Sequence, residues 1–255
     1  MGTIDSDDAL SKLWDTNRNF YGGSSAALFL HDVCSTIGLR PAQRPPATNH
    51  GTGQSQAASV SKHNIAHVAN FQLPPRALAD HLVECYINRV YYLYPYFHLP
   101  AFRTAYNNLW EPADKWCKTP EIYNELGIGS GRSGGADTIV FHAALNAIFA
   151  LGCPFSDLPD SNKITASEAF FNRSAAHMGT DLLEYNDLGV VQVLLLVSQA
   201  LQGTSFPNKC WNAVGIACRM AFAIGLHVDP KYFPQESLEA NIRRRTWHGC
   251  ITIDM

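Results

Sequence analysis

The sequence predicts an all-α protein. Apolar residues recur at three- and four-residue spacing in segment after segment, which is the period of one face of an α-helix. No segment alternates apolar and polar residues as a half-buried strand does, and no internal repeat is present. Hydrophobic residues make up 46% of the 255 residues and charged residues only 16%, a balance that favours a sizeable buried core over disorder.

The first part of the chain differs in composition from the rest. Residues 7–37 predict two short helices around a glycine- and serine-containing turn. Residues 41–64 are rich in Pro, Gly, Ser, Asn, Gln and Ala with almost no large apolar residues, which is typical of a linker or disordered loop. We therefore divide the chain into a helical N-terminal arm over 1–40, a flexible linker over 41–72 and a main body over 73–255.

The main body opens with two helices separated by a corner. An amphipathic pattern covers Leu78–Leu93. It must end before Pro95, because proline disfavours helical backbone in the residue before it. Pro100 suits the first turn of a second helix that reaches about Trp110. Residues 111–135 are predicted to be mainly loop.

Five further helical segments follow this loop. They are predicted over 136–151, 165–185, 188–202, 208–226 and from 237 to the last residue. The segment 208–226 carries several alanines and Gly215. Small side chains let neighbouring helices approach closely, so we expect this helix to lie at the centre of the fold.

The charge of the chain argues against direct DNA binding. The formal net charge is −3 and the pI about 6.3. Affinity for the phosphate backbone comes from Lys and Arg, so a DNA-binding domain is usually far more basic. The seven cysteines include no C-x-x-C pair, and most lie in apolar runs. This pattern predicts reduced core cysteines of an intracellular protein, not a disulfide or zinc framework.

No targeting or membrane segment is predicted. Residues Met1–Asp8 carry acids and no apolar signal-peptide core. The most hydrophobic run, Leu188–Leu201, is shorter than the roughly 18 apolar residues that a membrane span needs. It also contains Gln192 and Gln199, so it predicts a buried helix.

The glycine-rich loop at 127–135 contains two motifs that resemble enzyme signatures. Gly129, Gly131 and Gly134 form a literal G-x-G-x-x-G, and Ser133 lies in a G-x-S-x-G. Both signatures require a preceding strand, whereas the residues before this loop look helical. We interpret the segment as a flexible loop and assign no nucleophile and no dinucleotide site.

Three other clusters have structural interpretations. His63 and His67 could share a helix face, but Asn64 stands where a metalloprotease motif has its glutamate, and we expect two solvated histidines. The tyrosine-rich stretch 91–98 lacks the basic groove of a base-stacking platform and predicts core packing. Arg243–Arg245 predicts a solvated helix face in which Glu239 pairs with Arg243. We therefore predict no catalytic, cofactor-binding or metal-binding residue.

Four segments together resemble the regulatory region of fungal Zn2Cys6 transcription factors, also called the fungal-specific or xylanolytic-activator-type domain. They are Leu73–Phe102, which ends in Tyr94-Pro95-Tyr96-Phe97-His98-Leu99-Pro100-Ala101-Phe102, the small-residue helix Ala143–Cys153, the run Trp211–Asp229 with Gly225-Leu226-His227-Val228-Asp229, and Glu239–Asp254 with Arg243-Arg244-Arg245-Thr246-Trp247. The matching motif residues are Pro95, His98, Phe102, Arg219, Gly225, His227, Asp229, Arg243, Arg244, Arg245 and Trp247. We expect structural roles for them, with the Arg–Trp helix pinned against a helix rich in small residues.

The resemblance implies a nuclear regulator of RNA polymerase II transcription. In the family, a binuclear zinc cluster with a C-x2-C-x6-C pattern contacts DNA, and this sequence has no such pattern. We therefore expect DNA contact only through a zinc cluster missing from this chain, no cofactor within it, and a domain that is C-terminally incomplete. A second copy, a co-regulator or a small-molecule effector are the candidate partners, and no membrane is expected. The alternatives are a non-functional or dominant-negative remnant and an uncharacterised α-helical enzyme.

Overall fold

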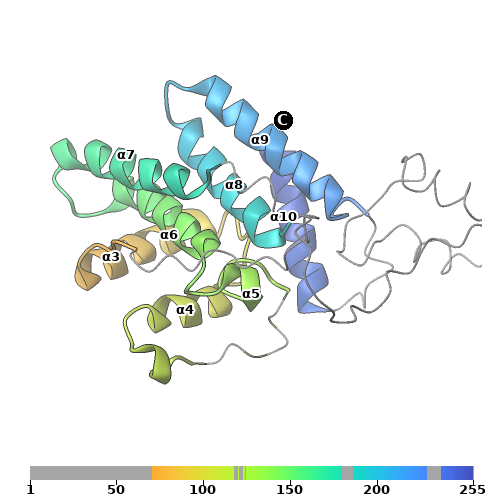
Figure 1. Cartoon of the computed structure of the whole chain (residues 1–255). Helices are drawn as coiled ribbons and strands as arrows, with labels where there is room; N and C mark the ends of the chain where they lie inside the picture. The colour runs from red at the N-terminus through yellow and green to blue at the C-terminus, as the bar shows by residue number, and fades with distance from the viewer. Residues whose placement is uncertain are drawn as a thin grey trace, which may run out of the picture. The chain divides into compact units, whose positions relative to one another are not determined.

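The computed structural model describes residues 71–117, 120, 123, 125–179, 186–228 and 237–254, without the side chains of residues 132 and 133. The chain divides into two units, Met1–Asn64 and Ile65–Met255, and every described residue belongs to the second. The expected N-terminal arm, most of the linker, His63 and His67 lie outside the described residues. Within those residues all regular structure is helical and no strand occurs, which confirms the all-α class (Figure 1).

The first helices follow the proline signals. Helix α3, Arg76–Tyr86, continues through a π-helical turn, Ile87–Tyr91, and ends before Pro95 as expected. Helix α4, Leu99–Asn108, has proline within its first two positions, where the ring's missing N–H leaves no helical bond unmade. A short 3-10 turn at Ala113–Lys115 and the one-turn helix α5, Gly131–Gly134, interrupt the predicted loop.

Helices α6, Ile139–Gly152, and α8, Leu188–Gln202, form the centre of the fold. Twelve of the 14 residues of α6 and twelve of the 15 residues of α8 are buried. Each begins at a polar cap: Thr138 Oγ1 accepts the Phe141 N–H at 3.2 Å, and Asp187 Oδ1 accepts the Gly189 N–H at 2.7 Å. Figure 1 shows α6 between α3 and α7, and both central helices contact several others: α6 contacts α3, α7 and α8, and α8 contacts α6, α9 and α10.

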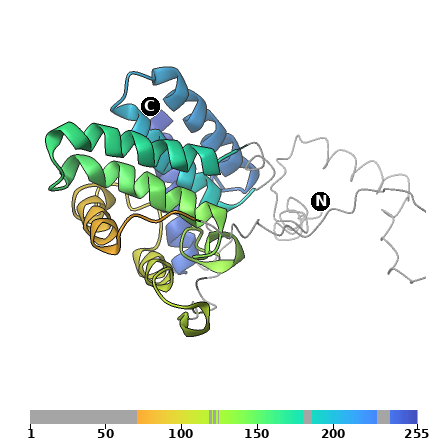
Figure 2. The same ribbon diagram turned by 60° about the vertical axis from the view of Figure 1, so that its left-hand side comes forward.

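The remaining long helices pack around these two. Helices α3 and α7, Asp160–His177, contact α6, and helices α9, Pro207–Ala223, and α10, Leu238–Asp254, contact α8 and each other (Figure 2). A short 3-10 turn, Cys153–Phe155, links α6 to the loop before α7. Helix α7 begins five residues earlier than predicted, because Pro159 precedes it and Asp160 occupies its first turn, where a carboxylate favours the helix dipole. It ends at His177, before the predicted end at 185.

The prediction that the 208–226 helix is central is wrong. Only four of the 17 residues of α9 are buried, and its outer face exposes Trp211, Ile216 and Phe222. A Cβ added to Gly215 would meet nothing within 4 Å, so this glycine does not serve a close helix contact. The central helices are recognised instead by being apolar all round.

Candidate regulatory site

The corner Tyr94–Phe102 is fixed by backbone hydrogen bonds and buried rings. Phe97 and Phe102 are fully buried, and Tyr91 Oη donates to the Phe97 carbonyl oxygen at 2.8 Å. Pro95 and His98 are half-buried, and His98 immediately precedes α4. Burial, and then the guanidinium of Arg245, lower the pKa of His98 below its usual value.

A buried glutamine joins this corner to three other segments. Gln192 of α8 is fully buried; its Nε2 donates to the carbonyl oxygens of Tyr96 at 2.9 Å and Leu126 at 3.2 Å, and its Oε1 accepts the Ile128 N–H at 2.9 Å. Thr246 of α10 donates its hydroxyl to the same Tyr96 oxygen at 3.1 Å. In the sequence, Gln192 is an interruption of an apolar run. A polar residue in such a run is the signal that could have indicated a buried hydrogen-bond network.

The glycine-rich loop is closely packed, and its interpretation as a flexible loop is wrong. Residues Leu126–Ser130 are buried, and the Gly129 N–H donates to the Gly134 carbonyl oxygen at 2.7 Å. Gly129 has φ +85°, and a Cβ there would lie 2.5 Å from Phe102 Cα, so only glycine fits. No strand precedes the loop within the described residues, and the Ser133 side chain lies outside them. The loop therefore serves packing between α4 and α8.

Helix α9 ends in a Schellman motif. The Gly225 N–H donates to the Phe222 carbonyl oxygen at 3.0 Å, and the Leu226 N–H donates to the Ala221 carbonyl oxygen at 2.9 Å. Gly225 has φ +67°, the left-handed conformation that this motif requires. This gives the expected helix stop a defined geometry. Asp229 lies outside the described residues.

Helix α10 is attached to this end of α9. Arg243 Nη2 donates to the Ile224 carbonyl oxygen at 2.6 Å. The Trp247 ring, half-buried, meets Phe222 edge-on with centroids 5.2 Å apart, and the His227 ring lies 4.7 Å from Phe222. The expected Glu239–Arg243 ion pair is not formed between these two described residues, because Arg243 caps α9 instead.

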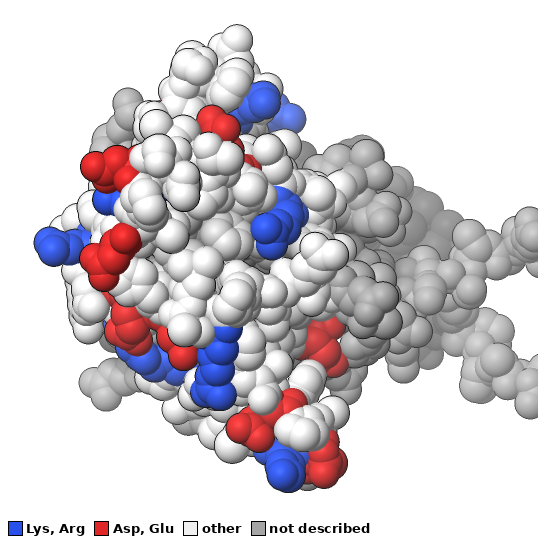
Figure 3. All heavy atoms as spheres, turned by 90° about the vertical axis from the view of Figure 1, so that its left-hand side faces the viewer, with Lys and Arg blue, Asp and Glu red and all other residues white. Residues whose placement is uncertain are grey.

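The other motif arginines have different positions. Arg219, Arg244 and Arg245 are exposed, which agrees with a solvated helix face for the basic cluster. Arg219 lies on α9, whereas Arg244 and Arg245 are consecutive residues of α10. On the face shown in Figure 3, Lys and Arg are interspersed with Asp and Glu, and a broad area carries neither.

The structure brings together a cysteine and a histidine that the sequence did not single out. Cys85 Sγ lies 3.7 Å from His81 Nε2, one helical turn away on α3. Burial, and then the charge of Asp157, raise the pKa of the Cys85 thiol. His81 Nε2 already accepts the Asp157 backbone N–H at 3.0 Å, so its lone pair is not available to deprotonate the thiol. The pair therefore lacks the activation that a catalytic thiol needs.

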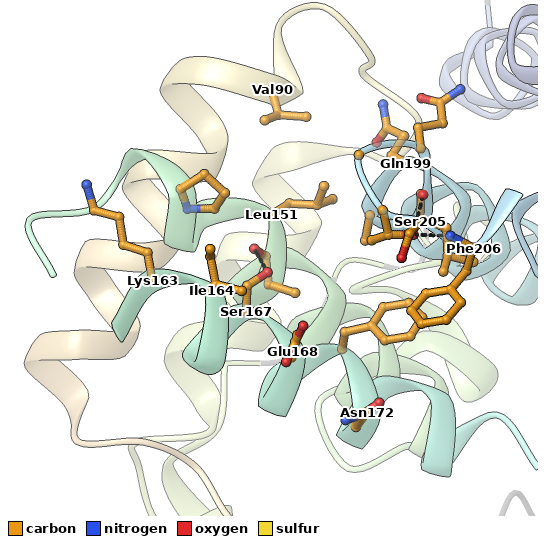
Figure 4. A pocket seen from close by; sticks show the side chains of 18 of the residues that line it. Val90, Leu151, Lys163, Ile164, Ser167, Glu168, Asn172, Gln199, Ser205 and Phe206 are labelled. Carbon is orange, nitrogen blue, oxygen red and sulfur yellow. Dashed lines mark hydrogen bonds between the residues drawn. The ribbon is translucent and has the colours of Figure 1, made fainter. Parts of the chain in front are cut away.

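An open groove of about 980 Å³ lies among the described residues (Figure 4). Helix α7 forms one wall, and the end of α8 with the following loop to Lys209 forms the opposite wall. The turn after α6 and Val90 complete it. Large apolar side chains line the groove yet remain exposed: Ile164 is 69%, Phe206 52% and Phe155 50% accessible. Exposed apolar side chains gathered in a hollow are typical of a binding site.

Among the described residues, no three His, Cys, Asp or Glu side chains are grouped as metal ligands. None of the helices described is both long and apolar enough to cross a membrane.

Residues 83–255 match the family described as the fungal specific transcription factor domain, and the chain belongs to this family. It is similar to transcription factor FBD3 of Gibberella moniliformis, with 27% identity over 96% of this chain and 32% of the relative. It is also 33% identical to the nitrogen assimilation transcription factor nirA of Emericella nidulans, over 94% of this chain and 23% of that protein. The sorbicillinoid biosynthetic cluster transcription factor 2 of Penicillium rubens is 25% identical over 77% of this chain and 27% of its own length.

The chain thus spans a third or less of the length of these curated relatives. No solved structure matches it. All three relatives are named transcription factors, and membership of the fungal specific transcription factor domain family points away from an enzyme.

Proposed function

We propose that this domain regulates RNA polymerase II transcription in the nucleus, as the ligand- or partner-responsive part of a longer zinc-cluster factor. In this proposal DNA is contacted outside the 255 residues, because a net charge of −3 does not favour binding to the phosphate backbone. The domain restrains a linked activation segment, and occupation of its groove changes that restraint.

The groove is the observation that carries this proposal. It lies outside the Gln192 network and the α9–α10 contact. Its walls come from segments far apart in the sequence, namely the α6–α7 turn, α7, and the loop between α8 and α9. A ligand that touches all three would change their relative stability, which is the physical requirement for transmitting a signal.

A reporter assay tests the regulatory role. The 255-residue chain is placed between a heterologous DNA-binding domain and an acidic activation segment in a fungal host. We expect lower reporter output than from the same fusion carrying Phe141→Asp, because a charge at a fully buried position unfolds the core. Equal output from the two fusions, at equal protein levels, would refute the restraint.

The same assay tests whether regulation depends on the groove. Ile164→Glu changes an exposed groove residue, whereas Glu111→Gln changes an exposed residue outside the groove. We expect Ile164→Glu to alter the reporter output and Glu111→Gln to leave it unchanged. A remnant without function would give unregulated output with all variants, and cooperative unfolding of the purified chain argues against such a remnant.

A further inference from the structure

Helices α9 and α10 pack against each other in an antiparallel arrangement (Figure 1). Arg243 bonds the Ile224 carbonyl oxygen, and further along α10 the Trp247 ring meets the Phe222 ring edge-on. Residue numbers rise along α10 while they fall along α9, so the contacts run in opposite chain directions. These two contact pairs fix the register of the two helices.

Two cysteines form the next contact pair in this register. Cys250 follows Trp247 by three residues on α10. Cys218 precedes Phe222 by four residues on α9. Each cysteine thus lies about one helical turn further along the face that already contacts the other helix. Cys218 Sγ lies 4.0 Å from the Cys250 carbonyl oxygen, and the Cys250 thiol donates a hydrogen bond to the Cys218 sulfur, so the two thiols are in contact.

Other described cysteines bond to backbone oxygens elsewhere. Cys210, two turns before Cys218 on the same helix, directs its thiol to the Ser198 carbonyl oxygen at 3.5 Å. The Cys85 thiol donates to the Phe155 carbonyl oxygen at 3.3 Å. The contact between two thiols is therefore a feature of the α9–α10 interface and does not follow from the cysteine content alone.

The two thiols differ in exposure and in ionisation. Cys250 is fully buried, whereas Cys218 is half-buried. Burial, and then the neighbouring Cys218, raise the pKa of Cys250 to about 12. Burial, and then the charge of Asp254, raise the pKa of Cys218, whereas the hydrogen bond from Cys250 lowers it. An oxidant therefore reaches Cys218 first, and Cys250 lies behind it in the position of a resolving thiol.

We propose that Cys218 and Cys250 form a redox switch, in which hydrogen peroxide converts the two thiols to a disulfide that links α9 to α10. The Cys218 thiolate attacks a peroxide oxygen, so an S–O bond forms, the O–O bond breaks and hydroxide leaves. The Cys250 sulfur then attacks the Cys218 sulfenic acid, so the S–S bond forms, the S–O bond breaks and the hydroxyl group leaves as water. The two thiols lose two electrons in total, the peroxide is reduced to two waters, and these waters take up the two thiol protons.

The disulfide makes the stability of the α9–α10 interface depend on the redox state. It closes the chain between Cys218 and Cys250 into a loop, which reduces the freedom of the unfolded chain. The oxidised domain therefore resists unfolding more than the reduced domain, and α9 is held on α10. Neither cysteine lines the groove, so the switch is independent of the proposed function.

Peptide mapping of the 255-residue chain after treatment with hydrogen peroxide tests the switch. Remaining thiols are blocked with iodoacetamide, and the monomer is isolated under non-reducing conditions and digested with trypsin. Trypsin releases Cys218 in the peptide 210–219 and Cys250 in the peptide 246–255. We expect these peptides to be joined, with a mass two hydrogens below their sum, and to be separated by dithiothreitol. The melting temperature of the oxidised chain should rise by about 5 °C or more and return on reduction.

Cys210 supplies the matched control, because it lies in the same tryptic peptide as Cys218. Cys210→Ser should keep both the joined peptides and the rise in melting temperature, whereas Cys218→Ser should abolish both. Circular dichroism checks that the variants are folded, and the map of the unaltered chain is decisive even without them. Separate peptides after oxidation, with Cys218 as a free thiol or a sulfinic acid, would overturn the proposal. A link that persisted in Cys218→Ser and disappeared in Cys210→Ser would overturn it as well.

Discussion

Gln192 of α8 donates a hydrogen bond from Nε2 to the carbonyl oxygen of Tyr96, 96 residues earlier, at 2.9 Å. The same oxygen accepts the Thr246 hydroxyl of α10 at 3.1 Å. One backbone carbonyl thus joins the first corner of the domain, its central helix and its last helix. These three segments contain two of the four motifs that resemble the family, so those motifs meet at a shared polar centre in the core.

Replacing Gln192 by leucine should destabilise the domain by about 2 to 4 kcal/mol, because the Ile128 N–H and the Leu126 carbonyl lose their partner inside the core. Urea unfolding followed by circular dichroism measures the change. Gln202→Leu is the matched control, since Gln202 ends the same helix but is exposed. If Gln192→Leu and Gln202→Leu lowered the free energy of unfolding equally, the hydrogen-bond network of Gln192 would not be formed.

Arg243 and Arg244 are adjacent in the sequence, but we predict that they contribute differently to the stability of the domain. Arg243→Ala removes the cap on the Ile224 carbonyl oxygen and should cost about 1.5 to 3 kcal/mol, the range for a hydrogen bond to a charged group. Arg244→Ala, at an exposed position, should change stability by less than about 0.5 kcal/mol. Thermal unfolding of both variants is the measurement, and a larger effect of Arg244 would contradict the α9–α10 contact.

His142 makes stability depend on pH. Burial lowers its pKa to about 3, while its Nε2 bonds to the Ala136 carbonyl oxygen at 3.0 Å. A histidine whose folded pKa lies below its unfolded value of about 6.5 binds protons more readily when unfolded, so stability is retained above pH 6.5 and falls as pH drops toward 3. At pH 5 the loss should be about 2 kcal/mol.

The variant His142→Gln tests this slope separately from the baseline stability. Its free energy of unfolding should change less between pH 7 and pH 5 than that of the unaltered chain, whatever its value at pH 7. His248→Gln, on the exposed face of α10, serves as control and should keep the full slope. Identical slopes for His142→Gln and the unaltered chain would assign the pH dependence to other groups.

Helix positions followed from local signals that act within a few residues. Pro95 placed the end of the first helical segment and Pro100 the start of α4, and the apolar run predicted α8 over 188–202, as observed. The start of α7 was missed although Pro159 and Asp160 are typical start signals, because its amphipathic pattern is weak.

Placement in the core did not follow from the same signals. Small residues in α9 are compatible with a central helix and with an exposed one, and only the partner helices decide between them. The closure of the glycine-rich loop depends on Phe102 and Gln192, which are distant in sequence. The groove likewise arises from three separated segments, so no local motif could indicate it.

The outer face of α9 gives a direct test of its corrected position. Trp211 is 75% exposed, whereas Trp247 packs against Phe222 and the end of the helix. Trp211→Ala should therefore alter the free energy of unfolding by less than about 0.5 kcal/mol, and Trp247→Ala should lower it by about 2 kcal/mol. Chemical denaturation compares the free energies of unfolding of the two variants. A larger loss for Trp211→Ala would indicate that α9 is buried in the core after all.

The charge of the chain leads to a prediction for DNA. With net charge −3 and its lysines and arginines interspersed with acids on the face in Figure 3, the 255-residue chain has little counterion release to gain from a duplex. We expect no sequence-specific binding tighter than about 1 µM at physiological salt, where specific DNA-binding proteins are far tighter. Fluorescence anisotropy with labelled duplexes, including a selected random pool, measures this. Sub-micromolar binding of one sequence over scrambled competitors would show that the domain itself reads DNA, and the regulatory proposal would then need a DNA-contacting surface on these residues.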